Sequence, residues 1–160
     1  MADVAALEWA CHEVYHEADP VPLAPARLAD VSPVQQMRLR LHLAPAVRFV
    51  ASRYPVLRIW QSHQSDTADA GSPISLDEGG VRLLVARRAL DIEFRRLGDA
   101  EDLWLRALAA GVTLCKATAS ALAFDPAFDL ANALGRHLSL GSFSGLSLAS
   151  HDAETEMRRP

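Results

Sequence analysis

The last third of the chain constrains its fold most strongly, because two alternating runs are followed by three helical patterns. Residues 81–85 and 90–96 alternate between apolar and polar side chains and are joined through Arg87-Arg88-Ala89. This pattern predicts a β-hairpin. A shorter run at 74–76 comes before the hairpin, separated from it by Glu78-Gly79-Gly80, and predicts the third strand of a meander.

The three helical patterns after the hairpin are bounded by residues that begin or end helices. The first covers about 99–110 and ends at Gly111, which tolerates a left-handed conformation. The second begins after Thr113, a suitable N-cap, and the third opens with Asp125-Pro126 and ends at Gly141. A meander followed by three helices predicts a winged-helix unit.

The third of these helices lacks the side chains with which a winged helix reads DNA. It offers Asp129, Asn132, Arg136 and His137, and residues 98–141 carry five acidic and three basic side chains. Phosphate binding needs several cations, so this composition disfavours a nucleic-acid partner. A winged-helix DNA-binding regulator stays an alternative. The favoured interpretation is protein or peptide binding, for which a sheet edge is suited.

The first part of the chain predicts helices and a small pair of strands. Residues 4–18 form an amphipathic pattern that ends at Asp19-Pro20, and residues 38–43 alternate strictly, with 47–50 as the partner strand. Tyr54-Pro55 is the expected entrance to another short helix. The sequence therefore predicts an α+β protein with a helical and strand-containing part at 1–63, a loop or linker at 64–73, the winged-helix unit at 74–149 and a frayed tail at 150–160.

Composition and charge exclude several classes of protein. The chain has 160 residues, half of them apolar, which is enough for a substantial core. No apolar run reaches the length of a membrane span, no signal peptide begins the chain, and Cys11 and Cys115 have no metal-type spacing. We therefore expect a cytoplasmic protein with reduced thiols and no membrane partner. Residues 1–36 carry six acids and one arginine, whereas residues 37–65 carry five arginines and no acid.

One motif has the pattern of a zinc hydrolase. His12-Glu13-Val14-Tyr15-His16 spells H-E-x-x-H, in which both histidines would reach one zinc ion while Glu13 polarises a bound water. Glu8, one turn earlier, would be a further ligand. Zincin helices pack under a sheet built from preceding sequence, however, and only eleven residues precede His12. We favour two half-exposed helix histidines, with a zinc hydrolase as the second alternative and no catalytic residue or metal site assigned.

Several segments taken together resemble a known family. They are Leu7-Glu8-Trp9-Ala10, Ala18-Asp19, Pro22-Leu23, Arg38-Leu39-Arg40-Leu41-His42 with Pro45, Arg53-Tyr54-Pro55-Val56 with Ile59-Trp60, and the C-terminal Gly111, Asp129-Leu130, Leu140-Gly141 and Phe143. Over about residues 5–148 the chain resembles the partner proteins of multinuclear non-haem iron oxidases that modify ribosomal peptides, the HvfC/BufC type, with the methanobactin protein MbnC as a cousin. The winged-helix part is shared with PqqD-like peptide-recognition domains.

The resemblance implies a division of labour between two subunits. The iron-dependent oxidase carries the metal and oxidises a cysteine of a precursor peptide, so no cofactor is expected on the present chain. A protein of this type binds the enzyme as a heterodimer and helps to present the leader of the peptide. Members of the family often carry an additional N-terminal helical domain, and this chain begins after the point where that domain would end.

Two sets of residues are the candidates for these contacts. The stretch 37–65 has the arginine and aromatic content of an interface centre. The contact with the enzyme is therefore assigned, within segment 1–63, to Arg38, Arg40, Arg53, Tyr54, Arg58 and Trp60. The outer hairpin strand would accept the leader as an added strand, in a groove bordered by Ile92, Phe94, Leu134 and Leu138. For each set the alternative is a structural role, in the core or on a solvated strand face.

Overall fold

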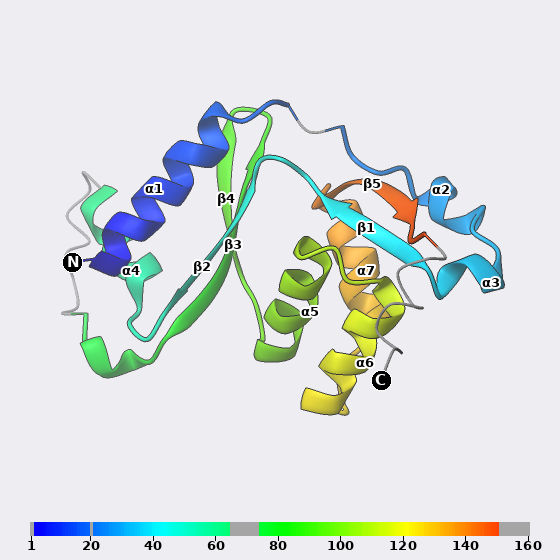
Figure 1. Cartoon of the computed structure of the whole chain (residues 1–160). Coiled ribbons are helices and arrows are strands. Elements are labelled where there is room, and N and C mark those ends of the chain that lie inside the picture. Colours follow the sequence, from blue (N-terminus) through cyan, green and yellow to red (C-terminus); the bar gives the residue numbers. More distant parts are fainter. Residues whose placement is uncertain (1, 20, 65–73, 151–160) are drawn as a thin grey trace, which may run out of the picture. The chain divides into compact units, whose positions relative to one another are not determined.

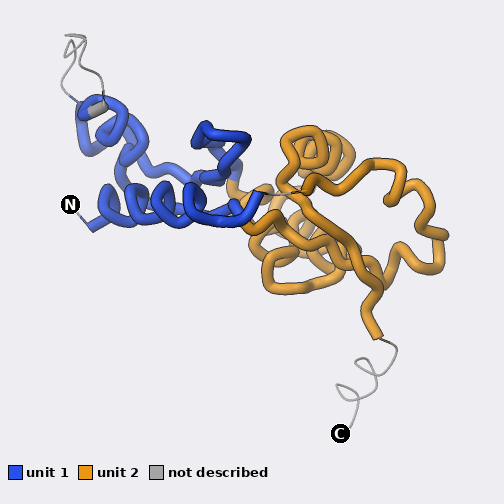
Figure 2. Tube along the Cα trace, turned by 90° about the horizontal axis from the view of Figure 1, so that it is seen from above, with its two compact units in different colours: residues 1–19, 46–98 blue, residues 20–45, 99–160 orange. Residues whose placement is uncertain are grey.

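A computed structural model describes residues 2–19, 21–64 and 74–150 and shows an α+β fold (Figure 1). The chain divides into two compact units, coloured separately in Figure 2. Unit 1 comprises Met1–Asp19 and Ala46–Gly98, and unit 2 comprises Pro20–Pro45 and Asp99–Pro160. Each unit is therefore built from segments that are distant in the sequence.

Unit 1 is a three-stranded antiparallel sheet with helices on one face. Its elements are α1 (Ala2–His16), β2 (Val47–Ser52), α4 (Val56–Gln64), the 3-10 helix η1 (Leu76–Glu78), β3 (Val81–Arg88) and β4 (Asp91–Arg96). The strand order is β2-β3-β4. The hairpin predicted from the sequence is confirmed, and its two-residue turn places Ala89 at φ 54°. Hairpin turns of this length require a positive φ.

The core of unit 1 lies between α1, α4 and the sheet. On α1 the buried residues Leu7, Ala10, Cys11 and Val14 follow the spacing of one helical face. The sheet and α4 complete this core with Ala46, Val50, Val56, Leu57, Val81, Leu83 and Val85. Burial of this apolar stripe, more than helix propensity, holds α1 in place.

Unit 2 combines a two-stranded antiparallel sheet with helices. Its elements are α2 (Pro25–Ala29), α3 (Pro33–Gln36), β1 (Leu39–Leu43), α5 (Asp99–Ala109), α6 (Leu114–Phe124), α7 (Leu130–Ser139) and β5 (Phe143–Leu148). Strand β1 pairs with β5 and contacts α5 and α6. Trp104 is fully buried at the centre, with its ring 6.2 Å from that of Phe143. Gly111 has φ 78°, which confirms the left-handed end expected for α5.

The pairing of the first two strands differs from the sequence prediction. β1 and β2 were expected to pair with each other, but β1 pairs with β5 and β2 pairs with β3. The two strands belong to different units. The predicted strand at 74–76 is also wrong, because Leu76–Glu78 forms η1, capped by the side chain of Ser75.

The third C-terminal helix begins later than predicted. Asp125 was expected to cap it, but the Asp125 side chain accepts a hydrogen bond from Ala127 N within a separate turn. The N-cap of α7 is instead Asp129, which accepts from Asn132 N at 3.0 Å. Both aspartates carry capping chemistry, so the local sequence did not discriminate between them.

The predicted segment boundaries do not coincide with the two units. The hairpin of the expected winged-helix unit lies in unit 1, whereas its three helices lie in unit 2. Within the predicted linker 64–73 and the predicted tail 150–160, residues 65–73 and 151–160 lie outside the described part of the chain.

Candidate functional site

The edge of unit 1 formed by β4 is the main candidate for binding a peptide. In the sheet order β2-β3-β4, β4 has β3 as its strand neighbour within the described residues. Along an antiparallel pair of strands, residue pairs that are hydrogen-bonded to each other alternate with pairs that are not. Leu97 N donates to Arg82 O at 2.9 Å, which makes Leu97 and Arg82 a hydrogen-bonded pair. Counting along the register, Arg95/Leu84 and Glu93/Ala86 are then also hydrogen-bonded pairs.

It follows that the main-chain groups of Ile92 and Phe94 point away from β3. Hydrogen bonding alternates along the pair, and these two residues lie opposite Arg87 and Val85 in the positions between the bonded pairs. Arg87 N donates instead to Ala46 O on the β2 side, in agreement with this pattern. The outward N–H and C=O groups of Ile92 and Phe94 therefore form the row that an added strand would use.

Half-buried apolar side chains accompany this row. Ile92 and Phe94 pack against the unit 1 core, as do Tyr54 and Trp60. The rings of Trp60 and Phe94 are 4.8 Å apart between centroids and inclined at 54°. The edge thus combines open main-chain groups with an aromatic surface from α4. Trp60 was assigned from the sequence to the enzyme contact, but the structure places it beside the expected leader site.

The other two residues predicted to border the leader groove belong to a different unit. Leu134 and Leu138 are half-buried on α7 of unit 2, whereas Ile92 and Phe94 lie on β4 of unit 1. The structure therefore does not bring these four residues together within one compact unit.

The residues predicted for the enzyme contact are also divided between the units. In unit 1, the Arg53 guanidinium lies 4.7 Å from the centroid of the Tyr54 ring, and Arg58 forms an ion pair with Glu78. Both arginines are exposed, as an interface with another protein requires. The segment 53–60 therefore presents a cationic and aromatic surface next to the start of α4.

Arg38 and Arg40 lie in unit 2, at and beside the start of β1. The Arg38 guanidinium donates to Ala149 O, with its Nε at 2.8 Å. On the same face, His42 Nε2 lies 2.8 Å from Ser147 Oγ on β5. The Nε atom of Arg40 is buried without a hydrogen-bond partner among the residues described. Arg38 thus has a structural role that its place in an arginine-rich strand did not indicate.

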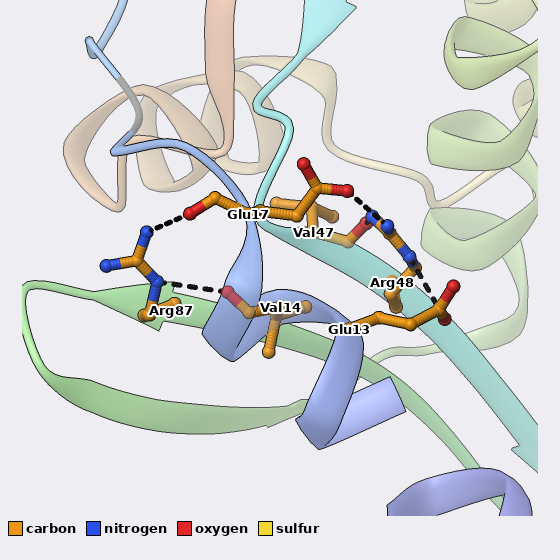
Figure 3. Close-up of polar contacts among 6 residues, drawn as sticks. All are labelled: Glu13, Val14, Glu17, Val47, Arg48 and Arg87. Carbon is orange, nitrogen blue, oxygen red and sulfur yellow. Dashed lines mark hydrogen bonds and ion pairs between the residues drawn. The ribbon is translucent and has the colours of Figure 1, made fainter. Parts of the chain in front are cut away.

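Two arginines to which the sequence assigned no functional role hold the C-terminal end of α1 to the sheet (Figure 3). Arg48 on β2 pairs with Glu13 at 3.2 Å and with Glu17 at 2.5 Å. Its hydrogen bond to Glu17 raises the pKa of the Arg48 guanidinium. Arg87 on β3 donates to Val14 O at 3.0 Å and to Glu17 O at 2.6 Å, at the end of the helix where carbonyls lack partners. Arg48 thus pairs with two of the six acidic side chains of segment 1–36.

The H-E-x-x-H motif lies on α1, with both histidines exposed and the glutamate paired with the sheet. His12 and His16 are exposed, and their ring centroids are 4.5 Å apart. Glu13 instead faces the sheet, where it pairs with Arg48. Within the described residues, no group of three or more histidine, cysteine, aspartate or glutamate side chains is arranged to hold a metal ion. This geometry does not favour Glu13 as the general base of a zinc hydrolase.

A buried polar cluster in unit 2 has the residue types of a serine hydrolase. His137 Nε2 lies 2.8 Å from Glu101 Oε1, and its Nδ1 lies 2.9 Å from Ser142 Oγ. Burial alone would raise the pKa of Glu101, but the hydrogen bond from His137 and the charge of Arg136 outweigh it and lower the pKa. The three residues lie on α5, on α7 and just before β5, and their hydrogen bonds join these elements. His137 is fully buried and Ser142 is 2% exposed.

The same cluster bears on DNA binding, because it takes up two of the polar residues of the third helix. Arg136 forms an ion pair with Glu101, and His137 is buried. Asp129 caps the N-terminus of α7. Among the described residues, Asn132 is the one of these four whose exposed side chain makes no ion pair and no helix cap. A helix with so few free polar side chains offers little to a base edge.

No family model matches the chain. Neither the curated proteins nor the solved structures include a significant match. In the part of the chain that the structure describes, no helix has the length and hydropathy to cross a membrane.

Proposed function

We propose that this chain is a non-catalytic partner subunit of an iron-dependent, peptide-modifying oxidase. In this role it binds the enzyme as a heterodimer and binds the leader of a ribosomally made precursor peptide. The oxidase, through its own iron, modifies a cysteine of that peptide. The identity of the enzyme partner derives from the family resemblance of the sequence, and the mode of peptide binding derives from the geometry of unit 1.

The observation that carries the proposal is the edge of β4. Its outward main-chain groups at Ile92 and Phe94 can bond a fourth strand, and the Trp60 and Phe94 rings lie beside that position. Main-chain hydrogen bonds then supply affinity, and side chains at alternate positions of the added strand supply specificity. An apolar residue of the leader would face the aromatic pair, and its neighbours in the strand would point to the opposite face.

The enzyme contact is proposed for the adjacent surface of unit 1. Arg53 and Tyr54 stack on each other, and Arg58 is exposed on α4. Arginine and tyrosine are enriched among the residues that dominate binding energy at interfaces. The PqqD-like winged-helix assignment is the finer part of the fold prediction and belongs to this proposal.

A pair of substitutions at Ile92 tests the mode of peptide binding. Ile92→Pro removes an outward N–H and keeps the inner hydrogen bonds of the hairpin, whereas Ile92→Ala shortens the side chain and keeps the N–H. The probe is a fluorescent peptide that corresponds to the leader encoded beside the oxidase. We expect the proline variant to lose binding by more than about tenfold relative to alanine, or ~1.4 kcal/mol. Equal affinities for the two variants would contradict strand addition.

Co-expression with the iron oxidase encoded beside the chain tests the subunit assignment. The expected result is a single heterodimer peak in size-exclusion chromatography that persists in moderate salt. Arg53→Ala with Arg58→Ala should weaken this complex, and Arg88→Ala, at an exposed arginine beside the hairpin turn, is the matched control. Separate elution of the two proteins would contradict a stable complex while leaving the peptide-binding test independent.

A further inference from the structure

We propose that His12 and His16 form a two-histidine binding site for a divalent transition-metal ion on the exposed face of α1. The two residues stand one helical turn apart, and both side chains are exposed. Their ring centroids are 4.5 Å apart. Residues four apart on a helix lie on the same face, so both imidazoles can reach one ion from the protein surface.

The hydrogen bonding of the histidines distinguishes this pair from the others in the described chain. His42 is bonded to Ser147, His63 to Ile59 O, and His137 to two buried side chains. No hydrogen-bond partner of His12 or His16 is found among the described residues. Their ring nitrogens therefore stay free for coordination, and imidazole nitrogen is a common ligand of metal ions.

The surroundings define the kind of site. Glu13 is paired with Arg48 of the sheet, so its carboxylate is engaged there and not with a metal-bound water. The described residues supply no third histidine, cysteine or carboxylate. The protein therefore contributes two ligands, and water completes the coordination. Such a site binds metal without hydrolytic chemistry, and this inference does not depend on the proposed function.

The ligand type determines which ions are expected. Imidazole suits Cu²⁺, Ni²⁺ and Zn²⁺, and affinity for a given site rises toward Cu²⁺ and falls again at Zn²⁺. Mg²⁺ prefers oxygen ligands. We therefore expect Cu²⁺ to bind most tightly, Zn²⁺ and Ni²⁺ to bind more weakly, and Mg²⁺ to show no binding.

A tryptophan beside the pair provides a local readout. The ring of Trp9 lies 5.4 Å from that of His12 and is 63% exposed. Trp60 is half-buried and Trp104 is fully buried. Cu²⁺ bound by His12 and His16 should quench the fluorescence of Trp9, and the Trp9→Phe variant should lose this change while still binding the ion.

The test is a titration of the tag-free full chain with Cu²⁺ and Zn²⁺, followed by isothermal calorimetry and tryptophan fluorescence. We expect one ion per chain, and a loss of affinity of at least about tenfold in His12→Ala and in His16→Ala, equivalent to ~1.4 kcal/mol. The matched controls His42→Ala and His63→Ala remove exposed histidines elsewhere and should bind as the original chain does. Circular dichroism confirms that each variant is folded.

Two results would overturn the proposal. One is the absence of Cu²⁺ and Zn²⁺ binding by the folded chain. The other is binding that His12→Ala and His16→Ala leave unchanged, because the ion would then be held elsewhere.

Discussion

Removal of the Arg87 guanidinium should weaken the attachment of the C-terminal end of α1 to the sheet, while Arg48 and the buried apolar face of α1 keep their contacts. In Arg87→Met the side chain keeps its length and apolar stem, but loses its donors to Val14 O and Glu17 O. The Arg87 side chain is 8% exposed, so both bonds lie largely out of water. Its ion pair with Asp19 contributes little, because the Asp19 side chain is 89% exposed.

The magnitude follows from the two main-chain bonds to the end of α1, since the third, from Arg87 Nη1 to Ala89 O, lies at the exposed hairpin turn. A hydrogen bond to a charged group contributes about 1.5–3 kcal/mol, and water at the helix end partly replaces the lost donors. We therefore expect the free energy of unfolding to fall by about 2–4 kcal/mol. Arg88→Met, at the exposed neighbouring position, should change it by less than about 0.5 kcal/mol.

Urea unfolding followed by far-UV circular dichroism measures both variants. For Arg87→Met we expect a lower midpoint with little change in slope, since the slope reports the surface exposed on unfolding. Amide exchange should also become faster in the last turn of α1. The reasoning would be refuted if Arg87→Met were as stable as the original chain, or if Arg88→Met were destabilised to the same extent.

Three further predictions concern single residues of the two units. Ala89→Gly should stabilise the chain by about 0.5–1 kcal/mol, because residue 89 has φ 54°, and a lower urea midpoint would contradict this. A maleimide should modify exposed Cys115 rapidly but buried Cys11 slowly, because burial also raises the pKa of the Cys11 thiol; mass spectrometry would contradict this if the rates were equal. Because the pKa of Glu101 is lower in the folded than in the unfolded chain, ionised Glu101 stabilises the fold at any pH above its unfolded-state pKa. This stabilisation is lost as the pH falls through the folded-state pKa of Glu101. Glu101→Gln should therefore reduce the change in stability between about pH 6 and pH 3, and an unchanged acid limb in a thermal melt would contradict the assignment.

Individual helices, strands and turns were predictable from the sequence where neighbouring side chains alone determine the local structure. The alternation in the hairpin, the N-cap at Thr113 and the glycine after α5 depend on side chains within a few residues, and the structure shows each of them. β5 was not predicted, because Ser144, Gly145 and Ser147 dilute its strand signal. Its strand conformation depends on pairing with β1, about a hundred residues earlier in the chain.

The pairing of distant segments within each unit could not be derived from local signals. Strand alternation shows that Leu39 and Leu41 face a core, but it does not show that β5 rather than β2 is the partner. The same limit applies to the arginines. Arg87 is part of a turn-like triplet in the sequence, whereas the structure uses it to hold the end of α1. Long-range contacts of this kind have no signature at fixed spacing.

Amide hydrogen exchange of ¹⁵N-labelled chain, with and without the leader peptide, tests the central claim most directly. If the leader adds to β4 as a strand, the outward amides of Ile92 and Phe94 should become protected on binding. The amides of Glu93 and Arg95, already bonded to β3, should change much less. Protection that misses Ile92 and Phe94, or that appears only on other elements, would contradict strand addition at this edge.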